Sequence, residues 1–164
     1  MLLKALASLR KSEKRGLVVE IHGANLEWQK PEFQQTINDL RGPLEKEGVL
    51  QWVGPYEPFQ LASRMAAVDW VVTPSIWWEN SPMVIQEAFV HGRPLVVSDI
   101  GGMAEKVRHG IDGWHVPVGS VRAWADALRT LAQHTSEWDN LRAAIRCPIN
   151  HTECATAHLA IISL

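Results

Sequence analysis

Short apolar runs alternate along this chain with segments that have the pattern of amphipathic helices, and no other feature constrains the fold more. Three of the runs hold strings of β-branched residues bounded by Gly, Pro or Asp, as buried parallel strands do. Strands and helices that alternate at this spacing form a parallel sheet with helices on both faces. We therefore predict an α/β fold, a Rossmann-like parallel sheet in three layers. The predicted strands are 16–23, 49–54, 70–75, 94–99 and 114–117, and the predicted helices are 2–11, 31–47, 58–67, 82–91, 102–109 and 121–133.

The length of 164 residues is that of one domain. We expect residues 1–135 to form the Rossmann-like domain and residues 136–164 to form a C-terminal helical tail that packs on it. The net charge of −2 argues against non-specific binding to nucleic acid, which needs a basic face. No apolar run approaches the roughly 20 residues that cross a bilayer. Because the two cysteines give no disulfide framework, we expect a cytoplasmic protein.

The tail contains residue types that occur in zinc sites, but their spacing is wrong for such a site. It places all of them on one face of a predicted helix, strung along roughly 16 Å at 1.5 Å per residue. Ligands spread in this way cannot meet at one tetrahedral ion, so we predict no metal and no other cofactor. The residues are Cys147, His151, Cys154 and His158.

In a parallel sheet of this kind, the ligand crevice lies beyond the carboxyl ends of the strands. The turn after Ser75 is the richest of the turns at that edge, and a helix follows it, with Ser81 as the predicted N-cap and Pro82 as the first helical residue. Glu79 then lies in the turn, whereas Glu87 lies roughly 8 Å up the helix axis. Glu87 borders the buried stripe of this helix, so its carboxylate can reach the crevice. The stripe consists of Val84, Ile85, Ala88 and Phe89.

The free amides at the start of this helix form a site for an anion, because the helix dipole and the unsatisfied N–H groups point the same way. The carboxylates of Glu79 and Glu87 flank that site. Carboxylates accept hydrogen bonds from hydroxyl groups, whereas amides donate to phosphate. The arrangement fits one ligand that carries both phosphates and sugar hydroxyls.

With the segments around it, this region resembles the retaining glycosyltransferase family 4, whose members have the two-domain GT-B fold. The resemblance extends over about residues 1–135 and is strongest over residues 70–119. It rests on the pair of glutamates with seven residues between them, on the Pro-Ser strand end before them and on two glycine-containing motifs after them. The residues are Pro74-Ser75, Glu79, Glu87, the stretch from Gly92 to Glu105 and the turn from Gly110 to Gly113. Within that stretch, Gly101-Gly102 is either a plain turn or a ligand contact, and both interpretations stay open.

The resemblance implies that the chain is the C-terminal, donor-binding half of an enzyme that transfers a sugar from a nucleotide diphosphate sugar, with retention and without a metal. Glu79 matches the family glutamate that contacts donor-sugar hydroxyls, and it is the implied catalytic residue. Glu87 matches the glutamate that holds the ribose hydroxyls. The loop with Gly54 and Tyr56 resembles the base-binding edge. The amides implied to bind sugar hydroxyl and diphosphate are those of Asn80, Ser81, Met83 and Val84.

Some parts of the family pattern have no match in this chain. They are a first central strand, a Gly-Arg pair and a lysine that clamp the diphosphate, and the N-terminal acceptor-binding domain. We therefore expect the isolated chain to be inactive. Three hypotheses stay open: the donor half of a transferase, a non-catalytic nucleotide-sugar-binding or partner subunit that completes a separate domain, and a sugar-nucleotide epimerase relative.

The unmatched first strand has a consequence for the sheet. The family's strand order is 3-2-1-4-5-6, so the predicted strands 17–22 and 70–75 would flank an unfilled central position. Buried backbone groups without a partner cost roughly 1–3 kcal/mol each. We expect these two strands either to pair directly or to borrow a strand from another chain, and we favour self-association or marginal stability.

Overall fold

The protein has an α/β architecture with five parallel strands, and the computed structural model describes residues 1–23, 25–133 and 136–162. The strands lie in two ladders, one of order β1-β2 and one of order β3-β4-β5. Each strand overlaps one of the five predicted ranges, so the predicted fold class is confirmed. The strands are β1 (Val19–Ile21), β2 (Leu50–Trp52), β3 (Val71–Thr73), β4 (Leu95–Ser98) and β5 (Gly113–Val116).

Helices occupy the connections between the strands, as the alternating pattern predicts. Prolines begin two of these segments, where the missing N–H group has no cost. No helix in the described ranges is both long enough and apolar enough to cross a membrane. The helices are α1 (Leu2–Ser8), α2 (Pro31–Lys46), α3 (Leu61–Ala67), α4 (Met83–Val90), α5 (Gly101–Lys106), α6 (Val121–Leu131), α7 (Ser136–Ala143) and α8 (His151–Ile162), and two short 3-10 turns are η1 (Leu26–Trp28) and η2 (Pro58–Gln60).

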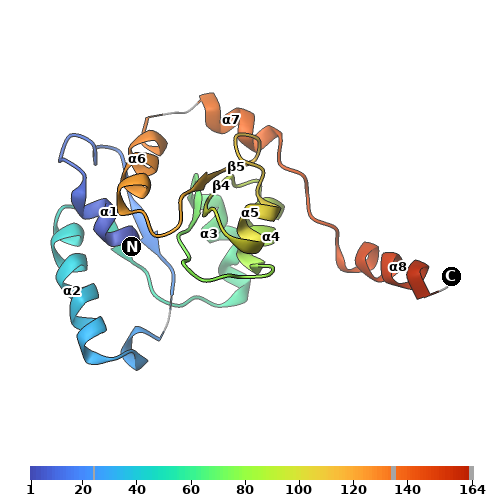
Figure 1. Ribbon diagram of the computed structural model, residues 1–164, viewed down its shortest axis with the longest axis horizontal. Helices are drawn as coiled ribbons and strands as arrows, with labels where there is room; N and C mark the ends of the chain where they lie inside the picture. The colour runs from blue at the N-terminus through green and yellow to red at the C-terminus, as the bar shows by residue number, and fades with distance from the viewer. Residues whose placement is uncertain (24, 134–135, 163–164) are drawn as a thin grey trace.

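The central strand β4 divides the core into two clusters. Leu95 and Val97 pack with α4 and α5 on one face of the sheet, whereas Val96 packs with α1 and α6 on the other. Trp124 of α6 is fully buried in the second cluster. Figure 1 shows the resulting layers, with α4 and α5 on one side of β4 and β5, and α1 and α6 on the other. The alternation of side chains along a strand thus explains the three layers.

The two tail helices differ in how they contact the domain. α7 packs on it: Leu141 is buried, and the indole N–H of Trp138 donates to the backbone oxygen of Asp69 at 2.7 Å. α8 extends away from the rest of the chain, and none of its described residues is buried (Figure 1). The apolar side chains of α8 belong to neither core cluster among the described residues, and the packing of a tail over residues 136–164 stays a prediction.

The two ladders do not join. Among the described residues no strand pairing links β1 to β3, so each of these strands has a ladder partner along one edge only. Nevertheless, the cluster around Trp124 includes Leu50 of β2 as well as Val96 of β4, so one core extends behind both ladders. Direct pairing of the strands expected to flank the central position, one of the two outcomes foreseen from the sequence, is therefore absent from the described structure.

Candidate functional site

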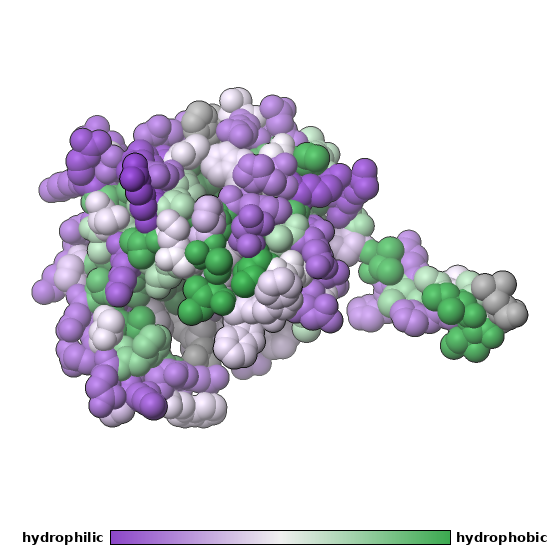
Figure 2. Space-filling model, viewed as in Figure 1, coloured by the Kyte–Doolittle hydropathy of each residue, from purple (hydrophilic) through white to green (hydrophobic). Residues whose placement is uncertain are grey.

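A loop of nine residues, 74–82, connects β3 to α4 and contains the first predicted site glutamate. Its first half is ordered by the backbone N–H of Trp77, which donates to the Ser75 hydroxyl at 3.1 Å. Trp77 and Trp78 are 75% and 71% exposed, whereas Glu79 after them is half-buried. Figure 2 shows green and near-white side chains gathered near the middle of the visible face, over this loop. The loop thus combines an apolar exposed surface with one shielded carboxylate.

Helix α4 begins one residue later than predicted. The N-cap is Pro82, whose extended backbone (φ −61°, ψ 122°) lies outside the helical region, and the backbone N–H of Ile85 donates to its oxygen at 3.2 Å. Ser81 is therefore not the N-cap, and no side chain caps the helix. As first-turn residues, Met83 and Val84 have N–H groups without an acceptor inside the helix. These two amides remain available to an acceptor outside the protein.

The burial of α4 agrees with the predicted stripe. Ile85, Ala88 and Phe89 are buried, and Val84 packs against the same cluster. Glu87 is half-buried at the border of this stripe. The two predicted carboxylates therefore lie before and after the open first turn of α4, one in the loop and one on the helix.

Two glycines at the start of α5 hold the glutamate loop in place. The backbone N–H of Gly102 donates to the backbone oxygen of Glu79 at 2.7 Å. A Cβ atom at Gly102 would overlap the backbone oxygen of Asn80, and one at Gly101 would lie 2.8 Å from that of Glu79. Gly101 also has a φ of +54°, which favours glycine. The close packing shows that this pair supports the site through the backbone, a role that the sequence alone left open.

The predicted base-binding residues belong to a second group, at the ends of β1 and β2. Gly54 is buried with a φ of +82°, and its N–H donates to the backbone oxygen of Ile21 at 3.2 Å. Tyr56 follows it and contacts the His22 ring edge to face, with centroids 5.8 Å apart. The Arg64 guanidinium lies over the Tyr56 ring at 5.3 Å. In the described ranges, no hydrogen bond or ion pair connects this group to the Glu79 loop.

Sequence reasoning missed Arg64 and His22, although a signal for Arg64 exists. Leu61 and Met65 mark the inward side of α3, and Arg64 lies three residues after Leu61 on that side. A charged side chain on the inward side of a helix is rarely buried without a partner, so an arginine there indicates a partner residue or a ligand. No comparable local signal marks His22.

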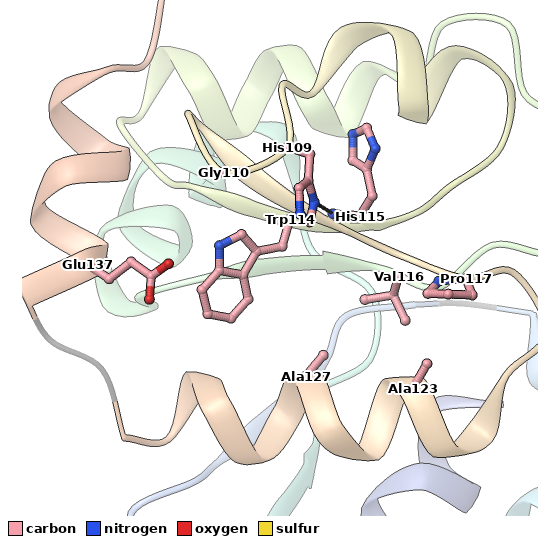
Figure 3. Close-up of a pocket in the computed structure, with 9 residues that line it drawn as sticks. All are labelled: His109, Gly110, Trp114, His115, Val116, Pro117, Ala123, Ala127 and Glu137. Atoms are coloured by element: carbon pink, nitrogen blue, oxygen red, sulfur yellow. Dashed lines mark hydrogen bonds between the residues drawn. The ribbon is translucent and has the colours of Figure 1, made fainter.

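A separate cavity of about 350 Å³ opens between β5, α6 and α7, and its lining includes none of the predicted site residues. The dashed line in Figure 3 marks the bond from the His115 backbone N–H to His109 Nδ1, which is 2.9 Å long. The His115 ring contacts Asp99 (Nδ1 to Oδ1, 3.3 Å) and the Val107 oxygen (Nε2, 2.6 Å). Because Asp99 directly follows β4 and lies two residues before Gly101, His115 links β5 to the segment that leads into α5.

The described residues contain no cluster of three or more side chains suited to a metal ion. In the tail, α8 begins at His151, so Cys147 lies outside the helix and the prediction of four residues on one helix face is wrong. Residues 145–150 are not helical. Pro148 lies among them, and because proline has no backbone N–H and its ring clashes inside a helix, it accounts for the later start of α8. Within α8, Cys154 Sγ lies 3.7 Å from His158 Nδ1.

Comparison with known families gives one match that covers most of the chain. The model for the family “Glycosyl transferases group 1” matches residues 1–146. A curated relative, D-inositol 3-phosphate glycosyltransferase of Corynebacterium aurimucosum, is 33% identical over 133 residues, which is 80% of this chain and 31% of the relative. Amylovoran biosynthesis glycosyltransferase AmsK of Erwinia amylovora is 29% identical over 147 residues, which is 80% of this chain and 36% of AmsK. The chain thus spans about a third of the length of these relatives.

Solved structures share the fold at lower identity. Anabaena HepE, crystallised with UDP, superposes with a TM-score of 0.77 at 22% identity, over 99% of this chain and 44% of HepE. A further HepE structure contains UDP-glucose and gives a TM-score of 0.75. WaaG, a glycosyltransferase of lipopolysaccharide biosynthesis, gives 0.68 at 19% identity and covers 98% of this chain and 41% of WaaG.

Proposed function

This chain belongs to the glycosyl transferases group 1 family, and on that premise we propose that it binds a nucleotide diphosphate sugar as the donor half of a retaining glycosyltransferase. The observation that carries the proposal is the uncapped start of α4 between two half-buried carboxylates. An uncapped helix start binds anions through its free N–H groups and its dipole. A diphosphate with a sugar at one end and a ribose at the other matches that order of groups.

The relatives support the chemistry of the ligand. HepE is known in complexes with UDP and with UDP-glucose. The curated relatives are named for glycosyl transfer to D-inositol 3-phosphate and for amylovoran biosynthesis. We infer that this chain takes a nucleotide diphosphate hexose, and that the sugar is passed on to a glycoconjugate or polysaccharide acceptor.

Each part of the site has a role in this proposal. The Glu79 carboxylate accepts hydrogen bonds from hydroxyls of the donor sugar, and Glu87 accepts them from the ribose. The amides of Met83 and Val84, with Asn80 and Ser81 before them, donate to the sugar and the diphosphate. When the bond from the anomeric carbon to the diphosphate breaks, negative charge develops on the diphosphate, and the start of α4 stabilises it. Gly54 and Tyr56 border the base.

Transfer needs an acceptor site in addition to this donor site. The chain covers 31% of the Corynebacterium relative and 44% of HepE, so most of each relative has no counterpart in it. We infer that an acceptor-binding domain completes the active site and that this chain binds the donor without transferring the sugar on its own.

Replacing the two glutamates one at a time tests the assigned roles. Glu87→Ala should weaken binding of both UDP and UDP-glucose about tenfold or more, because hydrogen bonds to a charged group contribute about 1.5–3 kcal/mol each. Glu79→Ala should weaken the binding of UDP-glucose by a similar factor and leave the binding of UDP nearly unchanged, because only the sugar reaches the loop. Isothermal titration gives the four dissociation constants.

Glu32→Ala is the matched control, because Glu32 is also an acidic residue near a helix N-terminus but lies on α2. This variant should bind UDP and UDP-glucose with the same dissociation constants as the wild type. If Glu79→Ala and Glu87→Ala weaken bare UDP equally, the roles assigned to them are wrong. If neither change affects either ligand, this loop is not the donor site.

A further inference from the structure

The proposed donor site leaves the choice of nucleobase open, and the cluster at the ends of β1 and β2 addresses it. Resting on the proposed function, we propose that Arg64 selects nucleotides whose base has a carbonyl oxygen, uracil or guanine, over those with an amino group there, cytosine or adenine. Arg64 comes from α3, and its partners come from β1 and from the loop after β2.

Two contacts hold the guanidinium of Arg64, and a third holds His22. Its Nη1 lies 3.3 Å from His22 Nδ1, and its Cζ lies 5.3 Å from the centre of the Tyr56 ring. His22 in turn places Nε2 3.0 Å from Oε2 of Glu20. Glu20 lies in β1 and His22 directly follows this strand, and their side chains meet at that end of it. The guanidinium is thus fixed on two sides.

The chemistry of these groups determines which ring nitrogen of His22 carries the hydrogen. A guanidinium only donates, so His22 Nδ1 must accept from Arg64. The ring then carries its hydrogen on Nε2 and donates it to Glu20. Arg64 itself forms no ion pair with a carboxylate in the described part of the chain. Its positive charge is held in position by neutral rings and is not neutralised by a direct partner.

Arg64 also has a donor that the protein leaves unused. Its Nε atom is buried and has no hydrogen-bond partner among the described residues. Because this atom is buried, a ligand does not reach it and contacts the outer nitrogens of the guanidinium. Of these, Nη1 lies against His22, and Nη2 donates to no acceptor among the described residues.

The position of the cluster fits a base rather than a phosphate. Tyr56, one of its members, lies two residues after Gly54, and the Gly54 loop is tied to the end of β1 by the N–H bonds of Val53 and Gly54 to Ile21. The open start of α4, where we place the diphosphate, belongs to the other ladder. One nucleotide can therefore have its phosphates at α4 and its base beside Tyr56 and Arg64.

Donor and acceptor patterns of the bases give the selectivity. Uracil presents O4 and guanine presents O6 and N7, which accept hydrogen bonds from a guanidinium, and the pairing of arginine with guanine is bidentate. Cytosine and adenine present an amino group at the corresponding position, and two donors facing each other repel. Lysine lacks the planar fork of arginine, so it can donate to one carbonyl oxygen but cannot reproduce the two parallel bonds of the guanidinium.

The test compares the dissociation constants of UDP, GDP, CDP and ADP for the wild type and for Arg64 variants, measured by isothermal titration. Wild type should bind UDP and GDP about tenfold to a hundredfold tighter than CDP and ADP. Arg64→Gln should bring the four constants to within about threefold of one another, because an amide both donates and accepts. Arg64→Lys keeps a cationic donor, so it should keep a preference for UDP over CDP and for GDP over ADP, weakened most for GDP, where the two parallel bonds are lost.

Arg41→Gln is the matched control. Arg41 also lies over an aromatic ring, that of Trp52 at 4.8 Å, but its remaining partner is Glu45 on the same helix. It should leave the selectivity unchanged. Equal binding of all four nucleotides by the wild type, or selectivity retained in Arg64→Gln with an intact melting transition, overturns the proposal and leaves the donor site standing. Failure of every nucleotide to bind overturns both proposals together.

Discussion

At the scale of single residues, the backbone of Gly102 meets the loop that carries Glu79 too closely for a side chain to fit between them. The contact joins the start of α5 to the two residues proposed to touch the donor sugar, Glu79 and Asn80. Gly102 and the loop with Glu79 are distant in sequence, so the Gly-Gly pair alone does not predict this contact. Its role became clear only when the fold brought the two segments together.

Gly102→Ala should therefore disturb the site from outside the ligand. The added Cβ atom overlaps the Asn80 oxygen, so the loop must move and the 2.7 Å bond from Gly102 to Glu79 is lost. We expect a loss of about 1–3 kcal/mol in the free energy of unfolding, as for other overpacked sites. Affinity for UDP-glucose should fall more than affinity for UDP. Chemical denaturation and isothermal titration measure the two effects.

Gly42→Ala serves as the control for that change. Gly42 lies inside α2, and a Cβ atom there meets nothing within 4 Å. Alanine has the higher helix propensity, so this variant should be neutral or more stable by up to about 1 kcal/mol. A Gly102→Ala protein as stable as wild type, with unchanged affinity for UDP-glucose, would show that the loop does not depend on this contact.

At the scale of elements, the positions of the strands and of most helices followed from the sequence. The apolar runs that became β3 and β4, and the stripe on α4, are local patterns, and local patterns are what periodicity reports. The start of α4 was placed one residue too early, because a proline fits both the first helical position and the N-cap. The bonds from Arg64 to His22 and from Trp138 to Asp69 join residues distant in sequence, so no local pattern predicts them.

One such long-range contact links the turn that follows α1 to α6 and responds to pH. Glu13, just after α1, accepts hydrogen bonds from the Arg10 side chain and backbone and from Arg129 of α6. The hydrogen bond from the Arg10 side chain is the largest of the effects that lower the pKa of Glu13 from 4.5 to about 2. Because the pKa falls on folding, the stabilisation is complete above the unfolded value and disappears as the pH falls towards the folded one.

Glu13→Gln should therefore lower the melting temperature near pH 6 but not near pH 2. Between these values the difference from wild type should shrink steadily as the pH falls through the range from 4.5 to about 2. Thermal melts followed by circular dichroism across this range give the comparison. A difference that is absent at pH 6, or as large at pH 2 as at pH 6, would contradict the assigned role of this carboxylate.

At the scale of the whole molecule, the sheet has the interruption that the resemblance implied. β1 and β3 stay apart, although one core extends behind both ladders. The free edges are consistent with a strand supplied by another segment or another molecule, and self-association stays a prediction that light scattering can check. The interruption also separates the two parts of the proposed site, the base cluster on β1 and β2 and the phosphate site after β3. A nucleotide that reaches both would bridge the ladders.

The measurement that tests the central claim most directly is a titration of the isotopically labelled chain with UDP-glucose, followed by nuclear magnetic resonance. Because the basic clamp that the resemblance implies has no match in this chain, the dissociation constant should lie between high micromolar and millimolar. The backbone signals that shift should be those of the loop and helix start, residues 79–87, together with Gly54, Tyr56 and Arg64. Shifts confined to other parts of the chain, or none at millimolar ligand, would contradict the account.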